Sequence, residues 1–306
     1  MSFEANSLKI WLQAARLRTL PLSFSGIIAG AALAIGEGAF NVHILVLSLW
    51  CTLLFQVISN FANDYGDGLK GTDNDQRLGP KRVLQSGLLT ASQLKRGIVI
   101  LSVVALISVL GLLLVSFGRT NWPYFVLFFI LGIASIWSAI RYTVGGSAYG
   151  YKGFGDLFVF LFFGLLSVLG SKFLYSLHLS LLDLLPAMVI GSLSVSVLNL
   201  NNLRDHENDR LSNKNTLVVK FGYKWGKRYH LLLLSLAFLA SLGLDYFSFN
   251  SYLDLWPLLI FIPLLFHAIK VFKTTSPSLL DPELKKVALL TFLWSICFLI
   301  GYNNLL

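Results

Sequence analysis

The sequence predicts an all-α membrane protein in which about nine helices cross the bilayer. Of its 306 residues, 56% are apolar and only 13% are charged, and the mean hydropathy is +0.72. A soluble domain carries about 25% charged residues. Apolar stretches long enough to span a bilayer recur along the whole chain. These observations define a polytopic membrane protein.

The expected spans are separated by Gly and Pro residues that favour turns. No linker or shift in composition divides the chain, so we expect a single domain over residues 1–306. We expect no cleavable signal peptide, because the polar start at residues 1–8 runs straight into the first span. The predicted spans cover residues 16–36, 42–62, 96–117, 122–141, 157–178, 182–203, 229–249, 253–272 and 286–305.

Basic residues concentrate in alternate loops. Of the 24 Lys and Arg residues, only Arg119 and Lys172 fall on the opposite side. The positive-inside rule therefore predicts a cytoplasmic N-terminus and an external C-terminus. The net charge of +9 follows from this topology and does not indicate a nucleic-acid surface.

Two acidic clusters stand at the ends of the second and sixth spans, both on the predicted cytoplasmic side. If each helix continues past its apolar run, an Asn and two Asp side chains of each cluster share one helix face, at i, i+4 and i+7 or i+8. These residues are Asn60, Asp64 and Asp67 in the first cluster, and Asn201, Asp205 and Asp209 in the second.

The clusters favour a metal site that binds a diphosphate. A carboxylate near a bilayer is costly, by roughly 2.5–3.5 kcal/mol at a helix centre, and is usually functional. Hard oxygen ligands select Mg²⁺ or a similar ion, which keeps coordination positions open for phosphate oxygens. Asp73 and Asp75 follow the first cluster closely. The alternative is that these residues only cap helices and begin turns, which explains one cluster better than two matched ones.

Basic and aromatic residues near the clusters can complete such a site. Lys or Arg can neutralise a diphosphate, and aromatic faces can stabilise a carbocation. The positive-inside rule and the Tyr and Trp belts of membrane proteins are the alternative explanations. Asp156 can serve as a base, as a substrate anchor or as a helix N-cap. The other candidates are Lys81, Arg82, Lys152, Lys214, Tyr142, Tyr149 and Tyr151.

At these residues the sequence resembles the UbiA superfamily of intramembrane prenyltransferases. Asn63, Asp64 and Asp67 match the start of its first motif, Asn-Asp-x-x-Asp-x-x-x-Asp, but Gly71 stands where the final Asp is usual. Asp73, two residues later, is the candidate replacement. The second motif, Asp-x-x-x-Asp, matches Asp205 and Asp209.

Within that superfamily, the sequence is similar to the branch that prenylates 1,4-dihydroxy-2-naphthoate in menaquinone biosynthesis. Matching stretches lie in order at residues 15–21, 63–73, 79–87, 142–156 and 202–216. The resemblance implies nine helices around a central cavity in a bacterial cytoplasmic (inner) membrane. It also implies two Mg²⁺ ions that bind polyprenyl diphosphate, whose prenyl group is transferred with decarboxylation of the acceptor to give demethylmenaquinol.

The resemblance also implies roles for individual residues. The expected metal ligands are Asp64, Asp67, Asp73, Asp205 and Asp209, of which all but Asp73 are also expected to be catalytic, together with Lys152. The expected substrate-binding residues are Arg18, Asn60, Asn63, Arg82, Tyr142, Tyr149, Asp156, Asn201, Asn202 and Lys214.

Three alternative functions remain open at this point. Another branch of the superfamily would use another acceptor, such as 4-hydroxybenzoate or homogentisate. A cation transporter can also carry membrane carboxylates, although these would be expected near the bilayer midplane. A non-catalytic quinone-binding protein would have no need of two metal-spaced motifs.

Overall fold

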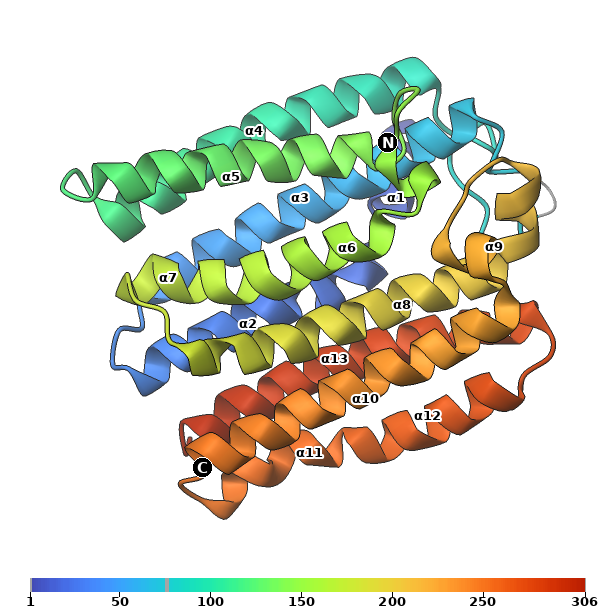
Figure 1. Ribbon diagram of the computed structural model, residues 1–306. Coiled ribbons are helices and arrows are strands. Elements are labelled where there is room, and N and C mark those ends of the chain that lie inside the picture. The colour runs from blue at the N-terminus through green and yellow to red at the C-terminus, as the bar shows by residue number, and fades with distance from the viewer. Residues whose placement is uncertain (1, 75–76, 306) are drawn as a thin grey trace.

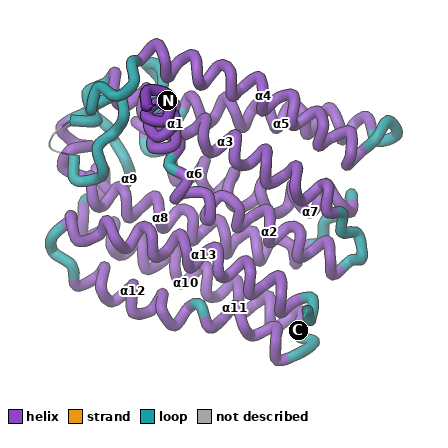
Figure 2. The backbone as a smooth tube through the Cα atoms, turned by 180° about the vertical axis from the view of Figure 1, so that it is seen from behind, coloured by secondary structure: helices purple, strands orange, loops and turns teal. Residues whose placement is uncertain are grey.

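The structure is a computed structural model that describes residues 2–74 and 77–305. Within these residues there are nine helical spans long and apolar enough to cross a membrane, and no strand. The all-α prediction with nine spans is therefore confirmed. The spans run roughly side by side in one bundle, and the two chain ends lie at opposite ends of it (Figures 1 and 2).

Several of the nine spans are built from more than one helical segment. The first combines α1 (Ser2–Ala15), the 3₁₀ turn η1 (Leu17–Thr19) and α2 (Leu20–Gly36). The next three are single helices, α3 (Val42–Leu69), α4 (Ala91–Phe117) and α5 (Trp122–Arg141). The fifth span joins α6 (Gly155–Val159), the π-helix η3 (Phe160–Gly170) and α7 (Ser171–Ser176), and the sixth joins η4 (Leu181–Asp183) and α8 (Leu184–Leu211). The seventh is the single helix α10 (Tyr223–Ser248). The eighth joins η5 (Tyr252–Leu255), α11 (Trp256–Leu259) and α12 (Phe261–Lys273), and the ninth joins η6 (Pro277–Leu280) and α13 (Asp281–Tyr302).

Helices α3 and α8 run several residues past their apolar stretches. We predicted ends at residues 62 and 203, but the helices end at Leu69 and Leu211. The acidic clusters therefore lie on the last helical turns and not in loops. Gly71 follows α3 with a φ of +71°, a left-handed conformation that glycine adopts without strain. The departure from the family motif thus coincides with the turn that ends this helix.

The first span runs from Leu8 to Gly36, so it begins before the predicted residues 16–36, and its helix is broken at Arg16. This residue has a φ of 48° and a ψ of 53°, a left-handed conformation that is uncommon outside glycine. Pro21 then lies in the first turn of α2, where its missing N–H costs no helical hydrogen bond. As a result α1 is a separate helix, which packs against α3.

The fifth span contains eleven residues in a π-helix, η3. Such helices are rare, and most are single turns at functional sites. Close packing holds η3 against α8, because a Cβ atom on Gly164 would lie only 2.7 Å from the Cα atom of Gly191. Small residues at such crossings let membrane helices approach each other.

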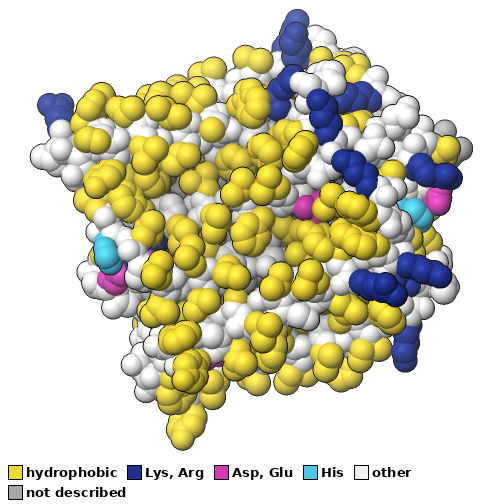
Figure 3. Space-filling model, viewed as in Figure 1, with side chains coloured by type: hydrophobic (Ala, Val, Ile, Leu, Met, Phe, Trp, Pro, Cys, Tyr) yellow, Lys and Arg dark blue, Asp and Glu magenta, His cyan; other side chains and the backbone are white. Residues whose placement is uncertain are grey.

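Three clusters of buried apolar residues form the core of the bundle. One packs α1, α3 and α4 together, a second joins α2 and α8 to α10, α12 and α13, and a third joins α3, α4, α5 and α7. Figure 3 shows an apolar surface over the middle of the molecule, with Lys and Arg side chains gathered towards the end that carries α9 (Leu217–Phe221). This distribution is the one expected of a multi-pass membrane protein.

Candidate active site

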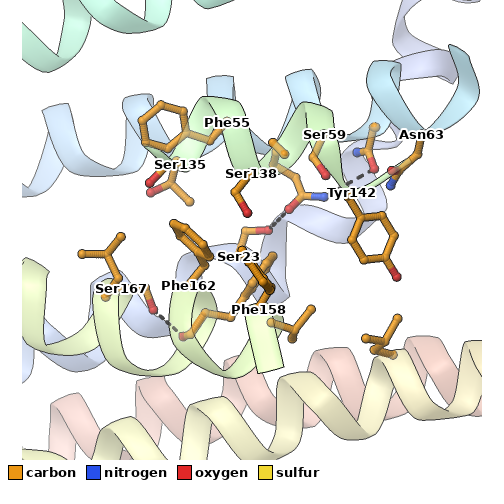
Figure 4. A pocket seen from close by; sticks show the side chains of 18 of the residues that line it. Ser23, Phe55, Ser59, Asn63, Ser135, Ser138, Tyr142, Phe158, Phe162 and Ser167 are labelled. Atoms are coloured by element: carbon orange, nitrogen blue, oxygen red, sulfur yellow. Dashed lines mark hydrogen bonds between the residues drawn. The ribbon is translucent and has the colours of Figure 1, made fainter. Parts of the chain in front are cut away.

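A cavity of about 430 Å³ lies inside the helix bundle. Its walls come from α2, α3, α4, α5, the α6–η3–α7 span and α8. Figure 4 shows Ser23 of α2, Phe55 of α3, Phe158 of α6, and Ser138 and Tyr142 from the end of α5 around this space. At one end its lining is charged and at the other it is apolar, so it suits a ligand with a charged head and a hydrocarbon chain.

Three of the predicted carboxylates line the charged end. Asp67 comes from α3, and Asp205 and Asp209 come from α8. All three are at least nine-tenths buried. The Lys214 Nζ lies 3.7 Å from the Asp67 Oδ2 and 3.8 Å from the Asp209 Oδ1. This buried lysine therefore joins the two acidic clusters at their centre.

Asp64 and Asp73 lie beside this group and pair with arginines. Asp64 is ion-paired with Arg16, and the Arg82 Nη1 lies 3.3 Å from its Oδ1. The Arg77 Nε lies 3.2 Å from the Asp73 Oδ1. Burial raises the pKa of Asp73 to about 7, and the neighbouring Asp67 acts in the same direction. A nearby cation would stabilise the ionised form of Asp73.

The chemistry of these residues fits a hard divalent cation. The group offers only carboxylate oxygens, which Mg²⁺ prefers. The Oδ2 of Asp73 is buried without a hydrogen-bond partner, and the Oδ1 atoms of Asp73 and Asp64 meet arginines in ion pairs. Among the described residues, no three acidic, His or Cys side chains are grouped closely enough to hold a metal. Arg and Lys side chains pair with the carboxylates instead.

The loop after α5 contributes a tyrosine to the acidic group. The Tyr151 hydroxyl donates a hydrogen bond of 2.7 Å to the Asp67 Oδ1 and lies 2.6 Å from the Thr72 hydroxyl. The Lys70 Nζ lies 3.8 Å from the centre of the Tyr151 ring. In contrast, Lys152 is exposed and does not line the cavity. The short 3₁₀ turn η2 (Tyr149–Lys152) brings Tyr151, and not Lys152, to the carboxylates.

The two predicted tyrosines line the cavity where its charged and apolar parts meet. Tyr142 and Tyr149 pack edge to face, with ring centroids 5.4 Å apart. Tyr149 stacks on Phe158 at 3.9 Å and donates a hydrogen bond to the Ser138 carbonyl oxygen. Burial raises the pKa of Tyr149 to about 12, so this phenol stays protonated at neutral pH.

The remaining predicted residues divide into two sets. Asn60, Asn63, Asn201, Arg82 and Lys214 line the cavity. Arg18 is exposed, and Asn202 and Asp156 are buried, but none of these three lines it.

Sequence reasoning missed Arg16, Arg77 and Arg204. Arg16 and Arg77 line the cavity, and the Arg204 Nη2 pairs with the Asp205 Oδ2 at 2.6 Å. In the sequence, each of these arginines lies within a few positions of an acidic cluster or of the first span. That proximity is the signal that could have identified them. The positive-inside rule explains that signal equally well.

A membrane helix bundle with a carboxylate-lined cavity of this kind is the arrangement of an intramembrane prenyltransferase. The sequence matches the UbiA prenyltransferase family over residues 23–296, and the chain belongs to this family. The earlier resemblance is thereby confirmed.

Named relatives cover nearly the whole chain. A 1,4-dihydroxy-2-naphthoate octaprenyltransferase of Escherichia coli (strain K12) is 43% identical, over 95% of this chain and 94% of its own length. The enzyme of the same name from Haemophilus influenzae is 41% identical, over 96% of each chain. A UbiA homolog from Archaeoglobus fulgidus, solved with GPP and Mg²⁺, shares the fold with a TM-score of 0.62 at 14% identity, over 93% of this chain and 99% of its own.

We expect Asp73→Asn to raise the Mg²⁺ concentration needed for half-maximal activity by about ten-fold. The variant removes one buried carboxylate, and a factor of ten corresponds to about 1.4 kcal/mol, close to the lower end of the range of about 1.5–3 kcal/mol for hydrogen bonds to charged groups. Titration of activity with Mg²⁺ measures the change. The sequence also pointed to Asp75 as a rival, but Asp75 lies outside the described residues. An unchanged titration for Asp73→Asn would show that the other carboxylates suffice.

Proposed function

We propose that this protein transfers a polyprenyl group from polyprenyl diphosphate to 1,4-dihydroxy-2-naphthoate. The aromatic acceptor loses its carboxylate in the reaction, and demethylmenaquinol, diphosphate and carbon dioxide are formed. The main support is the name shared by relatives that are 41–43% identical over nearly the full length. Family membership also argues against the alternative of a cation transporter.

In this proposal the charged end of the cavity holds the diphosphate. Asp64, Asp67, Asp73, Asp205 and Asp209 are the residues that would hold Mg²⁺, two ions in our proposal. Bound Mg²⁺ would supply Lewis-acid stabilisation of the negative charge that develops on the diphosphate.

Basic side chains at the charged end of the cavity would also bind the diphosphate. Arg77, Arg82 and Lys214 lie at the same end of the cavity, where their charges can bind phosphate oxygens. These side chains pair with carboxylates in the structure, so the same three cations can turn to the substrate when the carboxylates bind metal. The diphosphate then leaves with its charge neutralised.

The apolar part of the cavity protects the reactive carbon. Phe55, Phe158 and Phe162 project into it from α3 and the α6–η3 span (Figure 4). These walls exclude water, which would otherwise capture an allylic cation. The faces of Tyr142 and Tyr149 lie close to the charged end and can stabilise the cation before the electron-rich naphthoate ring attacks it.

We also propose an orientation in the bacterial cytoplasmic (inner) membrane. The end of the bundle that carries most Lys and Arg side chains would face the cytoplasm (Figure 3), in agreement with the positive-inside rule. The N-terminus and the carboxylates would then be cytoplasmic and the C-terminus external. Tight packing of α2 against α13 supports a single domain over the whole chain.

The product identifies the acceptor. We expect purified protein with Mg²⁺ and octaprenyl diphosphate to convert 1,4-dihydroxy-2-naphthoate to a prenylated product that has lost its carboxylate. Mass spectrometry of the lipid extract measures this product, and 4-hydroxybenzoate and homogentisate serve as competing acceptors. Product that keeps the carboxylate, or product from 4-hydroxybenzoate alone, would place the protein in another branch of the family.

A further inference from the structure

A second cavity lies beside the active site, at the end of the bundle that we place in the cytoplasm. This outer cavity has a volume of about 320 Å³ and lies between α1, η1, the end of α3 and residues 80–83. The reaction proposed above assigns no ligand to this cavity, although Asp64 and Arg82 line it. It is close to the lower limit for sites that bind small molecules, so it is large enough for a fused pair of rings and too small for a polyprenyl chain.

The lining of the outer cavity suits an aromatic anion. Among the described residues that line it, four side chains are cationic and one is acidic. The apolar residues Leu12, Leu17 and Val83 also line it and can cover the face of a ring. Its basic residues are Arg16, Arg18, Lys81 and Arg82. The exposed Arg18 makes no ion pair with any described residue, so its charge is available to a ligand.

Two arginines form the partition between the outer cavity and the active site. Arg16 and Arg82 line both cavities. Both pair with Asp64, whose side chain is only 1% exposed. Arg16 is held in a left-handed backbone conformation between α1 and α2, and strain of this kind concentrates at functional sites. A ligand in the outer cavity would therefore meet the same two guanidinium groups that face the reaction centre.

We propose that the outer cavity is the binding site through which the aromatic carboxylate acceptor reaches the active site from the cytoplasm. The inference rests on the proposed function, because that function supplies a water-soluble anionic acceptor. Arg18 and Lys81 bind the carboxylate first, and the apolar residues cover the rings. Arg16 and Arg82 then pass the anion inward between them. The prenyl diphosphate uses another route, since its chain does not fit the outer cavity.

Thiol protection can locate a ligand in this cavity without any turnover. Gln13 is exposed and lines the outer cavity. The chain has two other cysteines, Cys51 and Cys297, which are replaced by Ser for the experiment. Gln13→Cys in this background is treated with a thiol reagent, with and without 1-hydroxy-2-naphthoate. This probe keeps the rings and the carboxylate, and 1-naphthol serves as the probe without charge.

We expect 1-hydroxy-2-naphthoate at ten times its Kd to slow modification by about ten-fold, because the fraction of protein without ligand is the reciprocal of one plus the ratio of ligand to Kd. The charge-free 1-naphthol should protect far less at the same concentration. Adding Arg18→Gln and Lys81→Gln should remove the protection. As a matched control, Lys95→Gln removes an exposed basic residue of α4 that does not line the cavity and should leave the protection unchanged.

Kinetic measurements then connect binding to the reaction. Arg18→Gln with Lys81→Gln should raise the KM for the naphthoate acceptor about ten-fold, with little change in kcat or in the KM for prenyl diphosphate. Equal protection by geranyl diphosphate, or a rise in the prenyl diphosphate KM alone, would overturn the inference. Formation of prenylated naphthoate without any protection of Gln13→Cys would also overturn it while leaving the proposed function intact.

Discussion

Asp67→Asn and Asp209→Asn will each reduce kcat/KM for prenyl diphosphate by about a hundred- to a thousand-fold. Removal of a single group that stabilises charge in a transition state typically costs this much. Both carboxylates line the cavity, one from each acidic cluster, and Lys214 lies between them. Steady-state assays in detergent micelles measure the loss, and we expect Asp64→Asn and Asp205→Asn to behave similarly. EDTA should abolish wild-type activity, and added Mg²⁺ should restore it.

Glu207→Gln provides the matched control for these variants. Glu207 lies on α8 between Asp205 and Asp209, but its side chain is 62% exposed and pairs with Arg210. The Glu207→Gln variant removes one negative charge from the same end of α8, but this side chain does not line the cavity. Its activity should therefore remain close to that of the wild type. Activity near the wild-type level in Asp67→Asn or Asp209→Asn would contradict the model of two cooperating clusters. Equal losses in Glu207→Gln would point to damage to α8 as the cause.

Lys214→Met will weaken the use of prenyl diphosphate far more than Lys152→Met. Although burial alone would lower the pKa of Lys214, the nearby Asp67 and Asp209 carboxylates raise it above its usual range, and this lysine is therefore charged. Truncating one member of a buried charge pair costs about 2–5 kcal/mol, so we expect kcat/KM for prenyl diphosphate to fall by at least about thirty-fold. The methylene stem of Met keeps most of the packing.

Lys152→Met is the control for this prediction, because the sequence favoured Lys152 as a catalytic residue and the structure places it on the surface. Its activity should change by less than about three-fold, which corresponds to the small contribution of exposed charges. Thermal denaturation of both variants separates loss of binding from loss of folding. A large loss in Lys152→Met with an unchanged Lys214→Met would restore the assignment made from the sequence.

Local spacing made the two acidic clusters predictable. Residues at i and i+4 share a helix face wherever the helix continues, and α3 and α8 do continue through Asp67 and Asp209. The nine spans could also be predicted from the sequence, because the hydropathy of a segment depends only on its amino-acid composition. The helix ends were predicted too early, because polar residues mark the end of an apolar stretch and not the end of a helix.

Features that depend on a single backbone torsion or on distant contacts were not predictable. Arg16 separates α1 from α2 because its backbone is in the left-handed conformation. The residue type gives no indication of this conformation. The choice of Tyr151 over Lys152 depends on the direction in which one 3₁₀ turn faces. The π-helix η3 packs against α8, and its apolar sequence alone does not distinguish it from an α-helix. Tertiary contacts decide such features, so a single sequence carries little signal of them.

The helices that follow Lys214 pack on one side of the bundle, and the reaction cavity is lined by the helices that precede them. Among the described residues, none that lines the reaction cavity comes after Lys214. Helices α10 and α13 instead pack on α8 and α2, with Trp294 fully buried at their centre. Inherited or engineered changes in this final third should therefore shorten the lifetime of the enzyme at elevated temperature while each surviving molecule works at its normal rate. Heat-sensitive growth, and not altered substrate choice, is the phenotype that such alleles would show.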